Sequence, residues 1–252
     1  MTTVERRLPT PILTTPRRRR WNGVRMVAAL TLAAWSGLFW FLMLTGRTDL
    51  YLSTRTSWIV PMGAGVLGVV AAGLALSART TAPPPVRRRH VAVAAALLVP
   101  VVLVLASPPA TLGSFSASRK ASSAGSGLQT YWGTFDRSSD ITLLFVTAAQ
   151  FWPGGTQLLA QRAGSDVDFV GFVDRNVDTP ADEFLLTRFV VSCCVADATV
   201  TQVRVVNVPA GAFEVDEWVE VRGQIYPVGT EIIVTAATID PVPTPDVPYL
   251  TP

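Results

Sequence analysis

Residues 188–198, Arg188-Phe-Val-Val-Ser-Cys-Cys-Val-Ala-Asp-Ala198, contain both cysteines of the 252-residue chain. They end a run that is strongly strand-like, because β-branched and aromatic residues predominate in it. We therefore interpret this stretch as the centre of the single soluble domain.

Further strand patterns surround this stretch. Turn-forming residues at 174–180, 209–211 and 227–229 separate them. Five short strands at this spacing fit a small barrel or sandwich, and Gly171 and Gly223 favour the sharply bent strands of an oligonucleotide/oligosaccharide-binding (OB-like) β-barrel. The predicted strands are Val167–Val173, Glu183–Val191, Val200–Val208, Glu217–Tyr226 and Glu231–Ala237.

The composition places the rest of the chain in a membrane. Hydrophobic residues make up 49% of the sequence and charged residues 15%, whereas soluble domains average about a quarter charged. Residues 1–113 contain 13 Lys and Arg against two acids, and residues 114–252 contain 8 against 16 acids. The basic residues flank apolar segments and the soluble part is acidic, so we expect no nucleic-acid partner.

Three apolar segments are long enough to be membrane spans. The first is Met26–Leu44, the second lies between Arg55 and Arg79, and the third runs from Val91 to Ala106. Extension to Leu112 would lengthen the third span, and Pro100 would kink it. The first segment is long for a signal peptide and lacks a cleavage signature, which predicts an uncleaved anchor.

The basic residues predict the orientation of these spans. Arginines concentrate before the first span and in the loop from Arg79 to His90, and such clusters stay in the cytoplasm. The N-terminus is therefore expected inside the cell and the β-domain outside it, in a multi-pass cell-membrane protein. Arg119 and Lys120 oppose this assignment but are outnumbered.

The sequence predicts five regions. Residues 1–20 are expected to be a disordered basic cytoplasmic tail and residues 21–113 a three-helix transmembrane region. Residues 114–130, rich in Ser, Gly and Ala, are predicted to be a flexible linker. Residues 131–240 are expected to form the extracytoplasmic OB-like domain, including a short helix or strand at 140–151. Residues 241–252 are expected to be a Pro-rich tail. The fold class is thus membrane α plus all-β.

Small residues mark one candidate contact on the second span. Gly63, Gly68 and Ala72 would let a partner helix approach closely, although a Gly-rich span without any such role has the same pattern.

The cysteine pair has three interpretations. Cys193 and Cys194 are a structural pair, a thiol-redox pair that closes a strained vicinal disulfide, or metal ligands completed by Asp197. We expect no metal, since adjacent cysteines lack the Cys-x-x-Cys spacer and His90 is predicted on the other side of the membrane. Arg188 and Asp197 flank the pair and are interpreted as ligand-binding or structural residues, with a buried ion pair as the structural alternative.

Catalytic signatures are absent from the sequence. The β-domain contains no histidine, so a Ser-His-Asp or Cys-His system is unavailable. We expect no enzyme activity, no catalytic residue and no cofactor.

Several motifs resemble one family, the YcgQ-like permease subunits. They are Pro108-Pro-x-x-Leu112, Gly171-Phe-Val, Arg188-Phe, Cys193-Cys-Val-Ala-Asp-Ala198, Trp218-Val-x-Val-x-Gly223 and Pro248-Tyr-Leu250. The resemblance implies a membrane subunit that works beside a multi-spanning YcgR-like permease, with metal-ion homeostasis as one suggested role. Several members carry a His-rich loop between the second and third spans, and here that loop contains only His90.

Two functions follow from these patterns. The first is an accessory membrane subunit of a two-component permease, whose outer β-domain captures or gates solute. The alternative is an extracytoplasmic thiol-redox protein that uses Cys193 and Cys194.

Overall fold

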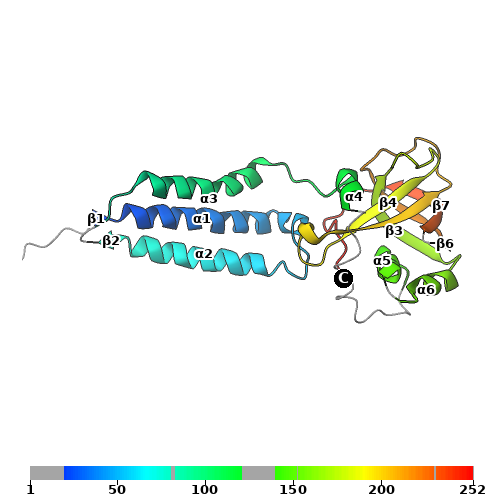
Figure 1. The fold of residues 1–252 in the computed structure, drawn as a ribbon, viewed down its shortest axis with the longest axis horizontal. Helices are drawn as coiled ribbons and strands as arrows, with labels where there is room; N and C mark the ends of the chain where they lie inside the picture. Colours follow the sequence, from blue (N-terminus) through cyan, green and yellow to red (C-terminus); the bar gives the residue numbers. More distant parts are fainter. Residues whose placement is uncertain (1–19, 81–82, 121–139, 152, 230, 252) are drawn as a thin grey trace, which may run out of the picture. The chain divides into compact units, whose positions relative to one another are not determined.

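The computed structural model describes residues 20–80, 83–120, 140–151, 153–229 and 231–251 (Figure 1). Their contacts divide the chain into two compact units. The helical unit consists of Met1–Leu38 and Gly63–Ala106, and the barrel unit of Phe39–Met62 and Ser107–Pro252. The segment between the first two spans, which the sequence assigned to the membrane region, therefore groups with the barrel.

Three helices in the described residues are long and apolar enough to cross a membrane: α1 (Gly23–Leu44), α2 (Ile59–Leu76) and α3 (Arg88–Ala106). They confirm the three predicted apolar helices. The extension of the third one to Leu112 is wrong, because residues that precede Pro108 and Pro109 disfavour helical backbone. The helix instead begins at Arg88, and its 19 residues reach about 28 Å at ~1.5 Å per residue.

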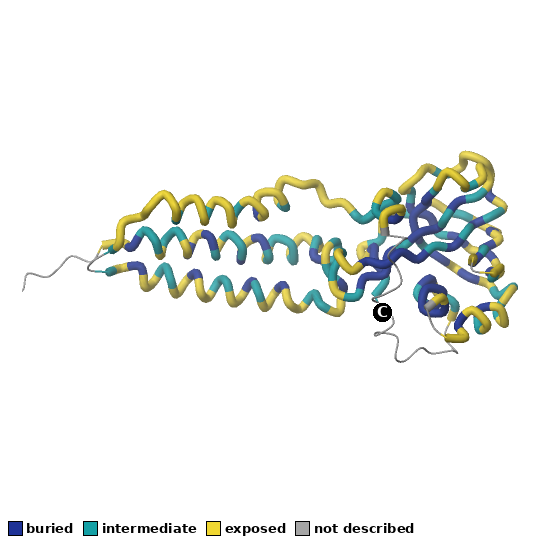
Figure 2. The backbone as a smooth tube through the Cα atoms, viewed as in Figure 1, coloured by how far each residue is buried: buried dark blue, intermediate teal, exposed yellow. Residues whose placement is uncertain are grey.

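Polar contacts between α1 and its neighbours organise the helical unit. The hydroxyl of Ser36 donates to the carbonyl of Ala64 on α2 at 2.8 Å, and the indole N–H of Trp35 donates to the carbonyl of Leu97 on α3 at 3.0 Å. Ala64 and Ala71 are buried against this interface, whereas exposed residues recur along all three helices (Figure 2). Near the start of α1, strand β1 (Arg20–Trp21) pairs with β2 (Arg79–Thr80).

Five strands of the barrel unit close into a barrel in the order β3-β4-β5-β7-β6. Neighbours run antiparallel except β5 and β7, which are parallel. This is the order expected of the OB-like barrel that the sequence predicts. The strands are β3 (Asp166–Asp174), β4 (Phe184–Val190), β5 (Thr199–Val206), β6 (Trp218–Val228) and β7 (Glu231–Pro241).

The inward-facing residues of the strands form the interior core of the barrel. Alternate positions such as Val167, Phe169 and Val173 on β3 are buried there, as the period of two requires. Helices α5 (Leu143–Phe151) and α6 (Gly155–Gln161) close the core with Leu143, Val146 and Leu159. Of the helix and the strand that the sequence allows at residues 140–151, the helix is correct and is α5. Helix α6 was not predicted.

The two glycines that suggested bent strands lie where backbones approach closely. A Cβ atom on Gly171 would lie 2.7 Å from the Thr187 carbonyl oxygen, and one on Gly223 would lie 2.1 Å from that of Thr235. The ladder between β6 and β7 shifts register at Arg222/Gly223. Both positions therefore require glycine, because any side chain would push two strands apart.

Two segments outside the strands are more ordered than the sequence suggests. The predicted linker is wrong for residues 114–120, which form helix α4 (Ser114–Lys120) with Ala117 fully buried; residues 121–130 lie outside the described residues. The Pro-rich tail begins as the end of β7, and Leu250 then pairs with Val190 in a parallel bridge. Residues 247–250, here called the strap, are therefore part of the barrel fold.

Candidate functional site

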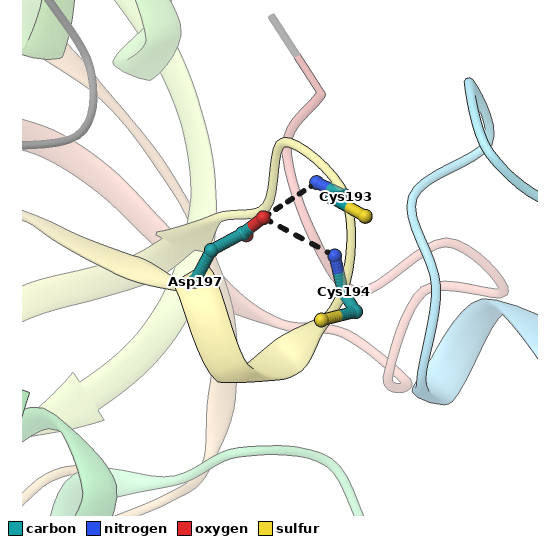
Figure 3. Close-up of side chains that lie close together, drawn as sticks. All are labelled: Cys193, Cys194 and Asp197. Carbon is teal, nitrogen blue, oxygen red and sulfur yellow. Dashed lines mark hydrogen bonds between the residues drawn. The ribbon is translucent and has the colours of Figure 1, made fainter.

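The cysteine pair lies in the turn between β4 and β5. Cys193 and Cys194 precede the 3-10 helix η2 (Val195–Asp197), and β5 begins two residues after it. The Asp197 carboxylate accepts the N–H groups of Ser192, Cys193 and Cys194 at 3.1, 2.8 and 3.3 Å. Figure 3 shows this carboxylate facing the backbone of both cysteines. Asp197 thus fixes the turn, because it accepts hydrogen bonds from three N–H groups that follow the end of β4.

The loop between α1 and α2 holds the other side of the same turn. Leu52 pairs with Cys194 in an antiparallel bridge, and the N–H of Val195 donates to the Tyr51 carbonyl at 3.0 Å. The Cys193 carbonyl accepts from the N–H of Ser53 at 3.1 Å and from the hydroxyl of Thr56 at 2.7 Å. No sequence pattern indicated this contact, because it is made mainly by backbone atoms about 140 positions apart in the chain.

Arg188 holds the strap, and it does not pair with Asp197. Its guanidinium donates to the carbonyl oxygens of Val247 and Pro248 at 2.9 and 3.0 Å, and to that of Val170 at 3.3 Å. It also lies 5.7 Å from the centre of the Trp218 ring. Burial lowers the pKa of this guanidinium, which remains charged at any physiological pH. The predicted ion pair is therefore wrong: both residues are used to bind backbone groups.

A second apolar cluster covers the outer face of the barrel. Its strand residues alternate with those of the interior core, so Phe172 points away from Phe169 and Val173. Phe172 stacks with Phe189 at 5.9 Å between ring centres and meets Trp218 edge-on at 5.8 Å. We call this set the outer-face cluster: Ala117, Phe172, Phe189, Val191, Ala198, Val200, Trp218 and Tyr249.

Two connections attach the chain before the barrel to this cluster. The Tyr249 hydroxyl accepts the N–H of Leu112 at 3.0 Å, and burial is the main cause of the raised pKa of this phenol. Asp216 accepts the N–H and the hydroxyl of Ser114 at 2.6 and 3.1 Å. The motifs at Pro108–Leu112 and Pro248–Leu250 therefore meet in space, which their sequence positions did not reveal.

The outer-face cluster occupies the usual ligand face of the fold. In OB-like barrels the second and third strands, here β4 and β5, form that face. Phe189 and Val200 on it are 1% and 8% exposed, because α4 and the strap lie over them. The usual ligand face of the fold is therefore covered by other parts of this chain.

The thiols have different exposures and one has a raised pKa. Both are free; Cys193 is exposed and Cys194 half-buried. Desolvation, and then the charges of Cys194 and Asp197, raise the pKa of the Cys193 thiol. Redox-active cysteines usually have lowered pKa values, because the thiolate is the nucleophile. A raised pKa lowers the fraction of Cys193 thiolate, the form that thiol exchange and metal binding both need.

The proposed helix contact at Gly63, Gly68 and Ala72 divides into two environments. A Cβ atom on Gly68 would lie 3.2 Å from the Ser36 hydroxyl oxygen, so Gly68 packs against α1 of its own chain. Gly63 is half-buried and Ala72 is exposed. Among the three, Ala72 is the position that a partner helix would meet.

These observations define a chain with three candidate membrane helices and a closed OB-like barrel. Residues 156–252 match the family described as the DUF1980 C-terminal domain. The matched segment covers all five barrel strands, the cysteine turn and the whole strap. A comparison with curated proteins gives no match.

Proposed function

We propose that this chain is a non-enzymatic accessory subunit of a two-component permease of the YcgQ-like type, anchored beside a multi-spanning YcgR-like partner. The match to the DUF1980 C-terminal domain is consistent with that resemblance. The observation that carries the proposal is the chemistry of the helices. After the first turns of α1 and α3, none of the three helices contains an acid, a base or a histidine.

Uncharged spans of this kind anchor and pack. Ion and proton pathways through membranes are marked by ionisable residues that face a bundle interior or a water-filled cavity. Three helices without such residues offer no relay, so a partner has to supply the pathway. Exposed small residues of α2, namely Gly65, Ala72 and Gly73, have open space around them for a close helix contact.

The barrel is proposed to act outside the cytoplasm. Residues 51–56 bond to residues 193–195 within the barrel unit, which supports one shared side of the membrane for this loop and the barrel. Three spans then place the N-terminus and the Arg-rich loop before α3 on the opposite side. The positive-inside rule makes that side the cytoplasm.

A topology experiment tests the location. A reporter that is active only outside the cytoplasm is fused either after Leu112 or at Pro84. We expect activity after Leu112 and none at Pro84. The reverse pattern would place the barrel in the cytoplasm and contradict the proposed location.

A co-purification experiment tests the partnership. Gentle detergent extraction should recover a multi-spanning permease with the chain, and Ala72→Leu should reduce that recovery because it fills the exposed face of α2. Gly68→Leu is the comparison variant, since it also disturbs the contact with Ser36 inside the chain. If the chain alone transports solute in reconstituted vesicles, the accessory role is wrong.

A further inference from the structure

The turn at Cys193 and Cys194 has its backbone fixed from two sides. Asp197 holds the N–H groups of both cysteines, and the loop at Ser53 and Thr56 holds the Cys193 carbonyl. Leu52 pairs with Cys194 across the same turn. The positions from which both sulfur atoms project are therefore set before any ligand arrives, and this removes part of the entropic cost of binding.

The spacing of the ligand atoms suits a metal ion. The two sulfur atoms and a carboxylate oxygen of Asp197 all lie within 4.8 Å of one another. Two thiolates on opposite sides of one ion, with metal–sulfur bonds of about 2.3 Å, are about 4.6 Å apart. The separation that one bridging ion needs therefore lies within this limit for the sulfur atoms of Cys193 and Cys194.

A disulfide fits the same turn poorly. Adjacent Cα atoms are about 3.8 Å apart across a trans peptide bond, whereas ordinary disulfides join Cα atoms about 4.4–6.8 Å apart. Closing the ring would twist the peptide between the cysteines, whose groups are bonded to Asp197, Ser53 and Thr56.

The ligand set selects the kind of ion. Thiolates are soft ligands that prefer Cu⁺ and Zn²⁺ among biological metals. The Asp197 carboxylate already accepts three N–H groups, so it is poorly available as a third ligand. Structural Zn²⁺ requires four ligands, and Cu⁺ accepts two thiolates in a linear arrangement.

Against the sequence-based expectation of no metal, we infer that Cys193 and Cys194 together bind one soft monovalent cation of the Cu⁺ type through both sulfur atoms. Asp197 is a positioning residue, which holds the turn and contributes negative charge. Binding replaces the two thiol protons with the metal ion, without a change of oxidation state. The inference rests on the geometry of the turn alone, so failure to bind Cu⁺ leaves the proposed permease role standing.

The test uses the full chain in mild detergent under anaerobic conditions. The protein is reduced, the reductant is removed, and thiol titration should give two free thiols per chain. Cu⁺ is then supplied as its complex with a chromophoric chelator, and transfer is measured from the chelator absorbance and from the ultraviolet band of a copper–thiolate bond. We expect one Cu⁺ per chain and far weaker binding of Zn²⁺ in the same competition.

Variants separate ligation from structure. Cys193→Ser and Cys194→Ser should each abolish stoichiometric uptake, while Asp197→Asn should weaken binding about 10- to 100-fold, as expected for residues that position ligands. Ser192→Ala is the matched control, since only its backbone N–H contacts Asp197, and it should bind like the wild type. Circular dichroism verifies that each variant keeps its fold.

Four results would overturn the inference. The first is two free thiols with no copper transfer, and the second is one Cu⁺ retained by either serine variant. The third is a preference for Zn²⁺ over Cu⁺, and the fourth is a cysteine pair that treatment with reductant does not convert to free thiols. Each contradicts a different part of the argument: the site itself, its two ligands, its metal and its resistance to disulfide formation.

Discussion

The interior core and the outer-face cluster are both apolar, but the chain builds them in different ways. The interior core comes from alternate strand residues and from α5 and α6, which directly precede β3. The outer-face cluster joins strand residues to Ala117 of α4 and Tyr249 of the strap, which lie on either side of the barrel in the sequence. The first makes the barrel stable, and the second attaches the chain on both sides of the barrel to its surface. Three predictions test this division, and a fourth concerns the buried carboxyl group of Asp174 at the end of β3.

The largest effect is expected from Phe184→Ala. Phe184 is fully buried in the interior core and meets Phe213 edge-on at 6.0 Å between ring centres. Removal of such a ring costs about 3–5 kcal/mol, because the closed barrel cannot collapse onto the cavity. The free energy of unfolding in denaturant, followed by near-ultraviolet circular dichroism, measures this cost. Phe189→Ala in the outer-face cluster should cost less, since α4 and the strap can move; an equal or larger cost would remove the distinction.

Arg188→Lys should release the strap from the barrel at a cost of about 2–3 kcal/mol. Hydrogen bonds to charged groups contribute about 1.5–3 kcal/mol each, and a lysine cannot reproduce the fork that holds the Val247 and Pro248 carbonyls. Hydrogen exchange should accelerate at the N–H groups of Val191 and Leu250, because their hydrogen bonds join the strap to residues 189–191.

Arg222→Lys provides the control for this substitution. Arg222 is half-exposed and forms ion pairs with Asp168, Glu220 and Asp240. Exposed ion pairs contribute about 0–1 kcal/mol, so exchange at the strap should stay unchanged. Equal effects of the two substitutions would mean that Arg188 has no special role at the strap.

Tyr249→Phe should cost about 1–2 kcal/mol. It keeps the ring against Phe189 but leaves the Leu112 N–H without its acceptor, and an unsatisfied donor is costly to bury. The loss should appear as faster hydrogen exchange at Leu112, with the interior core still protected. An unchanged exchange rate at Leu112 would show that water replaces the hydroxyl.

The smallest effect, and a stabilising one, is expected from Asp174→Asn. Burial, and then the charge of Asp216, raise the pKa of Asp174 above 3.8, against opposing hydrogen bonds from Arg175 and Gln202. A raised carboxyl pKa in the folded state means that the folded protein binds this proton more tightly than the unfolded chain does. Stability therefore falls as the pH rises through the folded-state pKa.

The asparagine variant lacks this dependence on pH. It should be more stable than the wild type at neutral pH, by less than about 1 kcal/mol because hydrogen bonds already stabilise the charged form. The difference should vanish below about pH 3.8, where the carboxyl group is protonated in both states. Unfolding free energies measured from pH 3 to pH 8 decide this, and a wild type more stable than the variant at pH 7 would contradict it.

Three apolar helices, five strands and the glycines at which strands bend could all be predicted from the sequence. These features depend on local composition, on the period of two, and on the close backbone approach that only glycine permits at Gly171 and Gly223. The cysteine turn was also recognisable as a candidate site, since it stands out by residue type.

The contacts of these residues could not be predicted, because they depend on how distant segments fold together. The Ser- and Ala-rich residues 114–120 have the composition of a linker, yet Asp216 and the outer-face cluster hold them as a helix. Arg188 and Asp197 have opposite charges and lie near each other in the sequence, yet each binds backbone groups. The loop at Tyr51–Thr56 reaches the cysteines through backbone atoms, which have the same chemistry in every residue and leave no pattern in a sequence. Contacts of that kind become visible only when the fold brings distant segments together.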